Sequence, residues 1–255
     1  MRNVLFVLAL SGIFAACANN SETSGDSSLM PAKHNQDTTV KEAPAKSVLT
    51  GKFNPAETEG FVKVPDEMAT KPMYIQQDAF NAFVKMRDAA AKEKVNLYIV
   101  SGTRTFNDQK AIWERKWNAL FLSNSDSLAV AKDILRFSSM PGTSRHHWGT
   151  DMDLVSVDPL YFENEVGKKT YNWLVIHASE YGFCQVYSSK EQFNRTGYSE
   201  EKWHWSYMPL SSEYLKAYLN TVSYSDLQGF IGDKLPTRLN IKEEFVKGID
   251  TRCVN

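Results

Sequence analysis

The sequence predicts an α+β fold in which a small antiparallel sheet is flanked by helices. Helical patterns and short runs of β-branched and aromatic residues follow one another without the regular alternation that a parallel sheet requires. Glycine and proline separate many of these runs, as expected for short strands joined by turns. The chain has 255 residues, 42% of them hydrophobic and 12% aromatic, which is enough for a substantial core.

The N-terminus is expected to lie outside this fold. Arg2 precedes the small and apolar stretch 4–16, and this order is typical of a secretory signal peptide spanning 1–16. Cys17 follows directly and resembles the lipidated cysteine of a bacterial lipobox, although Phe14 stands where leucine is usual. We therefore expect a lipid-anchored protein of the cell envelope, facing the periplasm or the exterior. The alternative is an ordinary cleaved signal with an incidental cysteine.

A flexible tether is expected between the anchor and the folded domain. After Cys17, the segment up to residue 50 is rich in Ser, Asn, Thr, Asp, Lys and Ala. Such a segment buries too little apolar surface to offset its ordering entropy. The folded domain is predicted to span 51–255, with a C-terminal extension from about 208 for which the sequence suggests no function.

Charge and cysteine content limit the function classes. The formal net charge is −1, so nothing suggests a nucleic-acid surface. Outside the N-terminus, no apolar run approaches the ~18 residues that indicate a membrane span. Outside the cytoplasm Cys184 and Cys253 could pair, but the sequence does not give their distance and leaves a disulfide open.

The first half of the domain is predicted to contain three helices and one strand. Segment 76–92 alternates apolar and charged residues at helical spacing. Segment 95–100 is an apolar run with β-branched and aromatic residues, which indicates a buried strand. Segment 108–122 carries two tryptophans four residues apart, as in a second helix, and 127–137 predicts a third.

The second half follows a proline-glycine turn at 141–142. Segment 151–157 reads as a strand that ends before Pro159, and 168–181 reads as a helix stopped by Gly182. Two short strands, 183–187 and 203–207, and a late helix, 212–220, complete the predicted elements.

Two histidines and an aspartate are candidate metal ligands. Gly149 permits an unusual backbone between His146 and Asp153, so the histidine can lie on a loop and the aspartate in a strand. Imidazole is the commonest metal ligand, and a carboxylate lowers the charge of a Zn²⁺ site. In an extended chain His147 would point the other way, to support the ligands or meet solvent. This spacing alone also fits an incidental histidine near an aspartate.

A second candidate pair is Glu201 and His204. Strand alternation places Trp203, Trp205 and Tyr207 on one face and His204 on the other. A glutamate beside such a cluster can be partly desolvated, which raises its pKa toward that of a useful base. The alternative is a solvated glutamate next to a core strand.

Arg104 ends the segment 101–104, Ser-Gly-Thr-Arg, just after the predicted strand 95–100. Side chains at strand ends often belong to active sites. A guanidinium carries a permanent charge and a fork of donors that suits a carboxylate or an oxyanion. The alternative is a structural salt bridge.

Together these motifs resemble the VanY-type zinc D-alanyl-D-alanine carboxypeptidases, from the wider group that contains lysostaphin-type peptidases and the hedgehog signalling domain. The resemblance runs from about residue 76 to 207 and implies the hedgehog-like fold of that group. It rests on Ser-Gly-x-Arg at 101–104 with Gln109, Pro-Gly-x-Ser-x-His-x-x-Gly-x-x-x-Asp at 141–153, Tyr-Gly-Phe at 181–183 and Glu-x-Trp-His-Trp at 201–205.

The resemblance implies a role for each matched residue. His146, Asp153 and His204 would bind one Zn²⁺, Glu201 would be the catalytic base, and Arg104 would polarise the scissile carbonyl. Ser144 and Gln109 would lie near the substrate. The sequence departs from the family at Asp151, Lys202 and Ser206, where Ala, Pro and Arg are common, and this leaves the subsite preferences open.

The function implied is a D,D-carboxypeptidase that hydrolyses D-alanyl-D-alanine bonds in peptidoglycan stem peptides, with zinc-bound water activated by Glu201. A D-Ala-D-Ala dipeptidase and a peptidoglycan endopeptidase are alternatives with the same fold. A non-catalytic cell-wall-binding lipoprotein is the alternative from another class, and Glu201 argues against it because a binding module needs no base. The expected partners are stem peptides and, through Cys17, the membrane; the oligomeric state stays open.

Overall fold

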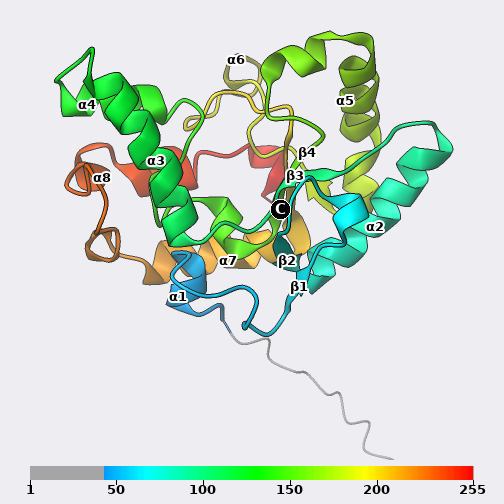
Figure 1. Cartoon of the computed structure of the whole chain (residues 1–255), viewed down its shortest axis with the longest axis horizontal. Coiled ribbons are helices and arrows are strands. Elements are labelled where there is room, and N and C mark those ends of the chain that lie inside the picture. Colours follow the sequence, from blue (N-terminus) through cyan, green and yellow to red (C-terminus); the bar gives the residue numbers. More distant parts are fainter. Residues whose placement is uncertain (1–42, 255) are drawn as a thin grey trace, which may run out of the picture. The chain divides into compact units, whose positions relative to one another are not determined.

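The computed structural model describes residues 43–254, and these residues form the α+β arrangement that the sequence predicts. Residues 1–16, Cys17 and most of the expected tether lie outside the described part of the chain. Figure 1 shows helices on both sides of a small central sheet. Within residues 43–254, no helix combines the length and apolar character needed to cross a membrane.

The central sheet has four antiparallel strands in the order β3-β4-β6-β5. Its strands are β3 (Ile99–Ser101), β4 (Asp151–Leu154), β5 (Phe183–Cys184) and β6 (His204–Tyr207). Strand β4 pairs with β6 in a register that sets Asp153 opposite His204 and Asp151 opposite Ser206. Directly paired residues share a face of the sheet, so one face of these two strands is polar. Met152, opposite Trp205, belongs to the other face.

The apolar face of the sheet packs on helices α2 (Gln77–Lys92) and α5 (Glu165–His177), which lie on the same side of the molecule in Figure 1. The prediction of a helix at 76–92 agrees with α2, whereas the helix predicted at 168–181 begins earlier, at Glu165, and its last four residues form the separate 3-10 turn η4 (Ala178–Tyr181). Met152 and Leu154 of β4 contribute to this core. This core also contains Phe83 and Met86 of α2, Trp173 and Leu174 of α5, Trp203 just before β6, and Trp205 in β6.

A second apolar core joins helices α3 (Phe106–Phe121), α4 (Ser127–Ile134) and α7 (Met208–Thr221) to the C-terminal segment. Trp113 of α3 donates a hydrogen bond to the backbone oxygen of Ile231 over 2.8 Å. A disulfide joins Cys184 of β5 to Cys253, with 5.8 Å between the Cα atoms. The segment beyond residue 208 is therefore an integral part of the domain.

The folded domain begins earlier than the expected boundary at residue 51. Helix α1 (Lys46–Leu49) falls in the last residues of the expected tether, yet Val48 and Leu49 are buried. The Nε1 atom of Trp148 donates to the backbone oxygen of Leu49 over 3.2 Å. A four-residue helix has no periodicity to detect, and its stability comes from this packing on a distant part of the chain.

Two further strands, β1 (Phe61–Lys63) and β2 (Tyr74–Gln76), form a separate antiparallel pair that was not predicted. Strand β3 is shorter than the expected 95–100, although Val95 and Leu97 are buried. The remaining elements are single turns: η1 (Asp66–Met68), η2 (Arg145–Trp148), η3 (Pro159–Glu163), η4 (Ala178–Tyr181), α6 (Lys190–Phe193), η5 (Tyr224–Asp226), α8 (Leu235–Arg238), η6 (Lys242–Val246) and η7 (Thr251–Cys253).

Candidate metal centre and active site

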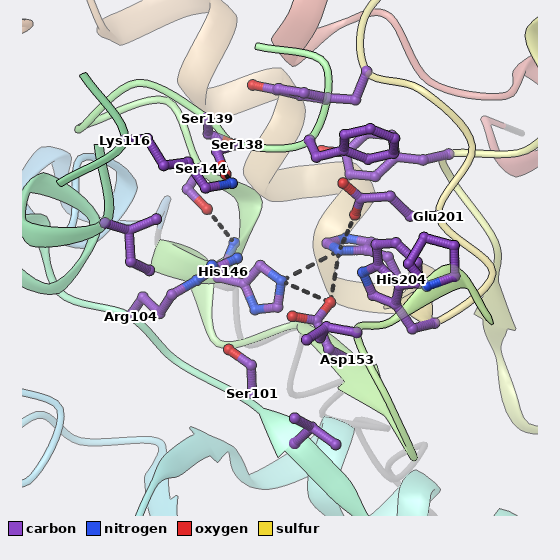
Figure 2. Close-up of a pocket in the computed structure, with 18 of the residues that line it drawn as sticks. Ser101, Arg104, Lys116, Ser138, Ser139, Ser144, His146, Asp153, Glu201 and His204 are labelled. Carbon is purple, nitrogen blue, oxygen red and sulfur yellow. Dashed lines mark hydrogen bonds and ion pairs between the residues drawn. The ribbon is translucent and has the colours of Figure 1, made fainter. Parts of the chain in front are cut away.

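Three buried side chains converge on one point at the polar face of the sheet (Figure 2). The Nε2 atom of His146 lies 3.2 Å from Oδ1 of Asp153 and 3.2 Å from Nδ1 of His204. The same Nδ1 atom lies 3.2 Å from Oδ1 of Asp153. Tetrahedral zinc, with ligands at 2.0–2.1 Å, holds neighbouring ligand atoms about 3.3 Å apart. The triangle therefore has the size of one face of a zinc coordination sphere.

The hydrogen bonds of the two rings leave lone pairs facing this point. Nδ1 of His146 lies 2.8 Å from the backbone oxygen of Gly102, which can only accept, so Nδ1 carries the hydrogen and Nε2 is free. Nε2 of His204 donates to Oδ2 of Asp151 over 2.9 Å, so Nδ1 is the nitrogen that carries the lone pair when the ring is neutral. Oδ1 of Asp153 is buried and accepts no hydrogen bond. Two nitrogen lone pairs and a carboxylate oxygen fit a cation such as Zn²⁺.

His146 lies on the 3-10 turn η2, while Asp153 lies in β4, as the glycine between them suggests. The Ser144 hydroxyl accepts from the backbone nitrogen of His146 over 3.3 Å and caps the turn. Gly149 ends the turn with φ of +70°, and a Cβ there would collide with the ring of Phe61. The chain needs glycine at this position both for its left-handed backbone and for lack of space.

His147 supports the site and does not meet solvent, which is one of the two expected alternatives, although the chain around it is a 3-10 turn and not extended. It is fully buried within η2. Its Nδ1 donates to the backbone oxygen of Arg104 over 2.7 Å, and its Nε2 accepts from the backbone nitrogen of Gly142 over 3.1 Å. His147 therefore ties the segment that carries Arg104 to the turn that carries His146.

Arg104 lines the same pocket as the three candidate ligands and lies on the His146 side of the group in Figure 2. Its backbone nitrogen donates to the backbone oxygen of His146 over 3.2 Å. Its Nε atom is buried without a hydrogen-bond partner, and no carboxylate among residues 43–254 forms an ion pair with it. The salt-bridge alternative thus has no partner in the described chain. An unsatisfied buried donor in a pocket is suited to an anionic ligand or transition state.

Glu201 lies beside the candidate ligands. Its Oε2 atom is 3.6 Å from Nδ1 of His204, and its side chain is buried. Burial raises the pKa of Glu201 to about 7, which agrees with the direction expected from desolvation. The rings of Tyr187 and Tyr198 line the same pocket, and neither tyrosine was among the candidate site residues. Trp205, by contrast, lies in the core on the other side of the sheet.

A buried network of charges and hydroxyls lies behind His204. Oδ2 of Asp151 accepts from His204 and, over 2.9 Å, from Nε of Arg145. Its Oδ1 accepts from the hydroxyls of Thr150 and Ser206, over 2.7 and 2.8 Å. Burial alone would raise the pKa of Asp151, but Arg145 and the hydrogen bond from His204 hold it below its ordinary value. This network keeps a carboxylate ionised behind the imidazole.

The two carboxylates also act on His204 itself. Burial opposes its positive charge, but the hydrogen bond to Asp151 and the adjacent carboxylate of Asp153 raise the pKa of His204 to about 9. The site therefore favours a cation between these groups, whether a proton or a metal ion.

The ligands open into a cavity of about 520 Å³. Ser144 lines it, as expected, but Gln109 does not. The Gln109 side chain is buried and its Nε2 donates to the backbone oxygen of Ser139 over 2.7 Å, so it supports the cavity wall from behind. Lys116 and Ser138 also line the cavity and were missed. Lys116 follows Gln109 by seven residues, two helical turns, and this spacing was the available signal.

The chain is similar in sequence to one protein family and to two curated proteins. The sequence model of the family described as "VanY: D-alanyl-D-alanine carboxypeptidase" matches residues 72–210. The chain is 30% identical over 167 residues to YodJ, a carboxypeptidase homologue of Bacillus subtilis (strain 168), covering 63% of this chain and 56% of YodJ. It is 28% identical over 142 residues to a D-alanyl-D-alanine carboxypeptidase of Enterococcus faecalis (strain ATCC 700802 / V583), covering 52% and 51%. The chain thus spans about half the length of these curated relatives.

Solved structures give similar matches. VanYB in complex with D-alanine-D-alanine has a TM-score of 0.49 and 24% identity, over 66% of this chain and 93% of that chain. A mutant of a vancomycin resistance D,D-pentapeptidase VanY, in complex with Zn(II), has a TM-score of 0.47 and 22% identity, over 65% and 93%. The LD-carboxypeptidase LdcB has a TM-score of 0.42 and 24% identity, over 60% and 75%.

Proposed function

This chain belongs to the VanY family of D-alanyl-D-alanine carboxypeptidases, and we propose that it is a zinc peptidase that removes the terminal D-alanine from peptidoglycan stem peptides. The observation that carries the proposal is the convergence of three buried ligand atoms, from two histidines and an aspartate, beside a further buried carboxylate. His146, Asp153 and His204 form one face of a coordination sphere, and Glu201 lies 3.6 Å from Nδ1 of His204. The relative from Enterococcus faecalis is named a D-alanyl-D-alanine carboxypeptidase, and this supports a peptide that ends in D-alanine as the substrate class.

The residues of this chain have distinct tasks in such a reaction. When bound, zinc supplies Lewis-acid chemistry, which makes water more acidic and polarises a carbonyl group. Glu201, with its raised pKa, accepts a proton from the attacking water and returns it to the leaving amine. The guanidinium of Arg104, whose Nε has no hydrogen-bond partner among residues 43–254, stabilises the negative charge that develops on the carbonyl oxygen. Buried walls formed by Tyr187 and Tyr198 limit the access of bulk water to the base.

Three assays separate the candidate functions. Purified residues 43–255 are loaded with zinc and metal content is measured. Mass spectrometry then follows release of D-alanine from a stem pentapeptide and from free D-Ala-D-Ala, and release of peptide fragments from a peptide with an internal D-Ala bond. The proposal expects about one zinc per chain and fastest release from the pentapeptide. Preference for the dipeptide or the internal bond would favour the dipeptidase or the endopeptidase. Full zinc occupancy with no turnover of any substrate would favour the non-catalytic cell-wall-binding protein.

We further propose that Cys17, which lies outside the described residues, anchors the domain to a membrane of the cell envelope. The support is the order of Arg2, an apolar stretch and Cys17. Cys17→Ser should release the protein from the membrane fraction without changing the catalysis of the purified domain. Mass spectrometry of the mature N-terminus decides the matter, because an unmodified peptide that begins at or beyond Ala18 would exclude the anchor.

A further inference from the structure

One wall of the active-site cavity carries a lysine that the proposed mechanism does not use. Lys116 of α3 lines the cavity, and its Nζ donates to the hydroxyl of Ser138 over 2.6 Å. Figure 2 shows Lys116, Ser138 and Ser144 grouped on one side of the candidate ligands, with Glu201 on the other side. A substrate that reaches the ligands therefore passes between a base and a cationic wall.

The charge of Lys116 is not neutralised by an adjacent carboxylate of the described residues. No carboxylate among residues 43–254 forms an ion pair with Lys116, although its side chain is half-buried. Burial lowers the pKa of Lys116, and the charge of Glu201 across the cavity raises it. Arg104 and Arg115 also line the cavity, whereas Asp153 is committed to the two histidines. The cavity therefore carries an excess of positive charge, which favours an anionic ligand.

The bonding at Ser138 adds a second donor to this wall. The Ser138 hydroxyl accepts from Nζ of Lys116 through an oxygen lone pair, so its own hydrogen remains available. An ammonium and a hydroxyl side by side can both donate to one carboxylate. Gln109 fixes this wall from behind through the backbone of Ser139. The pair is therefore held in place before a ligand arrives.

We propose that Lys116, assisted by Ser138, binds the free α-carboxylate of the substrate residue that leaves, and so makes the site specific for chain ends. This inference rests on the proposed peptidase function. The carboxyl carbon of the leaving residue is three bonds from the scissile carbonyl carbon, at most about 4 Å away. Its binding group must therefore share a cavity with the base, as Lys116 does with Glu201. An internal peptide bond offers a neutral amide at this place and leaves the cation without a partner.

The test compares two forms of one stem peptide, with a free terminal carboxylate and with a terminal carboxamide, on zinc-loaded enzyme. Wild type should have a kcat/KM at least tenfold higher for the acid. Lys116→Met should lower the value for the acid by about 10–100-fold, mainly through KM, and leave the value for the amide nearly unchanged, because a hydrogen bond to a charged group is lost. Lys116→Arg should restore part of the preference for the acid.

The matched control is Lys110→Met, which removes the same charge from the same helix. Lys110 is ion-paired with Glu114, with 3.9 Å between the charged atoms, and does not line the cavity. It should keep the acid preference of wild type. If Lys116→Met lowers turnover of acid and amide equally, or if wild type shows no preference, the inference is overturned while the proposed peptidase function stands.

A binding measurement keeps the two proposals separate if no turnover is found. Calorimetry on the zinc-loaded Glu201→Gln variant measures the dissociation constants of the acid and amide peptides directly. Tighter binding of the acid that is lost on adding Lys116→Met supports the carboxylate site even in a protein without peptidase activity. Equal affinities, or binding of neither peptide, overturn it.

Discussion

The Nε2 atom of His204 in β6 donates to Oδ2 of Asp151 over 2.9 Å. Asp151 lies in β4, two residues before the candidate ligand Asp153, and so holds the ring of the candidate ligand His204. The pairing of Asp151 with Ser206 and of Asp153 with His204 sets this geometry. Asp151 is a departure from the family pattern, where alanine is common. Its carboxylate fixes the tautomer of His204 and increases the basicity of Nδ1, the atom that would meet the metal.

Replacement of this carboxylate should weaken metal binding. We expect Asp151→Asn to raise the dissociation constant for zinc by about 10–100-fold, because a neutral amide orients the imidazole less well and leaves Arg145 without its ionic partner. Competition with a chromophoric chelator measures this constant. Asp133→Asn, which removes an exposed carboxylate on α4, should bind zinc as wild type does. Equal affinities for the two variants would show that Asp151 has no part in holding the ligand.

The base is separable from the metal site. We expect Glu201→Gln to keep stoichiometric zinc but to lose about 10²–10⁴ in kcat, because an amide cannot accept the proton of water. Metal analysis and D-alanine release on one preparation give both quantities. Glu200→Gln, one residue earlier, is the matched control and should retain activity. Full zinc occupancy with wild-type turnover in Glu201→Gln would refute the assignment of the base.

The two adjacent histidines should behave differently. His146→Ala should abolish stoichiometric zinc, since two remaining ligands hold the ion poorly. His147→Ala should retain zinc but destabilise the fold by about 1–3 kcal/mol per unsatisfied backbone group, because its ring bonds the backbone of Arg104 and Gly142. Zinc analysis together with thermal unfolding distinguishes these outcomes. Retention of zinc by His146→Ala and its loss from His147→Ala would place the ligand one residue later.

Arg104→Lys should bind zinc normally but turn over at least tenfold more slowly. Lysine keeps the charge but lacks the planar fork of donors, and loss of an oxyanion donor typically costs 10²–10³ in rate. Steady-state kinetics on the zinc-loaded protein give kcat and KM separately. The control is Arg87→Lys, which exchanges a partly buried arginine on α2 that is ion-paired with Asp88 and does not line the cavity. An unchanged kcat/KM in Arg104→Lys would assign Arg104 a structural role.

Zinc binding should depend on pH through His204, whose pKa in the metal-free protein is raised from 6.5 to about 9. Zinc must displace this proton from Nδ1, so the apparent affinity should rise about tenfold per pH unit below 9 and level off above it. In the metal-free protein the same shift stabilises the fold below pH 6.5, and this stabilisation is lost as the pH rises through about 9. Calorimetry of zinc binding in buffers of different ionisation enthalpy counts the released proton. Release of no proton at pH 7 would contradict the shift.

Patterns local to the sequence predicted a large part of this structure. The spacing of apolar residues located α2 and α3, and alternation in the segment up to Tyr207 separated the face of His204 from the face of Trp205. These features depend on residues a few positions apart, which secondary structure brings together directly. The candidates His146, Asp153, His204 and Glu201 came from motif spacing, and the structure places them around one point.

Features that depend on distant pairing were not predicted. The contact of Asp151 with His204 requires the register of β4 on β6, and the contact of Leu49 with Trp148 joins residues about a hundred positions apart. The disulfide between Cys184 and Cys253 likewise needed a distance that only the fold supplies. Gln109 shows the opposite case, because a family motif placed it near the substrate while its amide faces the backbone of Ser139.

Strand β6 restricts how this protein can diverge. Its side chains alternate between the apolar core and the candidate metal centre, so the position of a residue along the strand decides on which face of the sheet its side chain lies. Gain or loss of one residue between Glu201 and His204 would send the imidazole toward the core and an indole toward the ligands. Lineages descending from this chain can therefore exchange side chains around the cavity, but we expect their alignments to show no single-residue gaps in this strand. We expect insertions and deletions mainly in surface segments such as the one between α3 and α4, because adding a residue there does not turn a candidate ligand to the other face of the sheet.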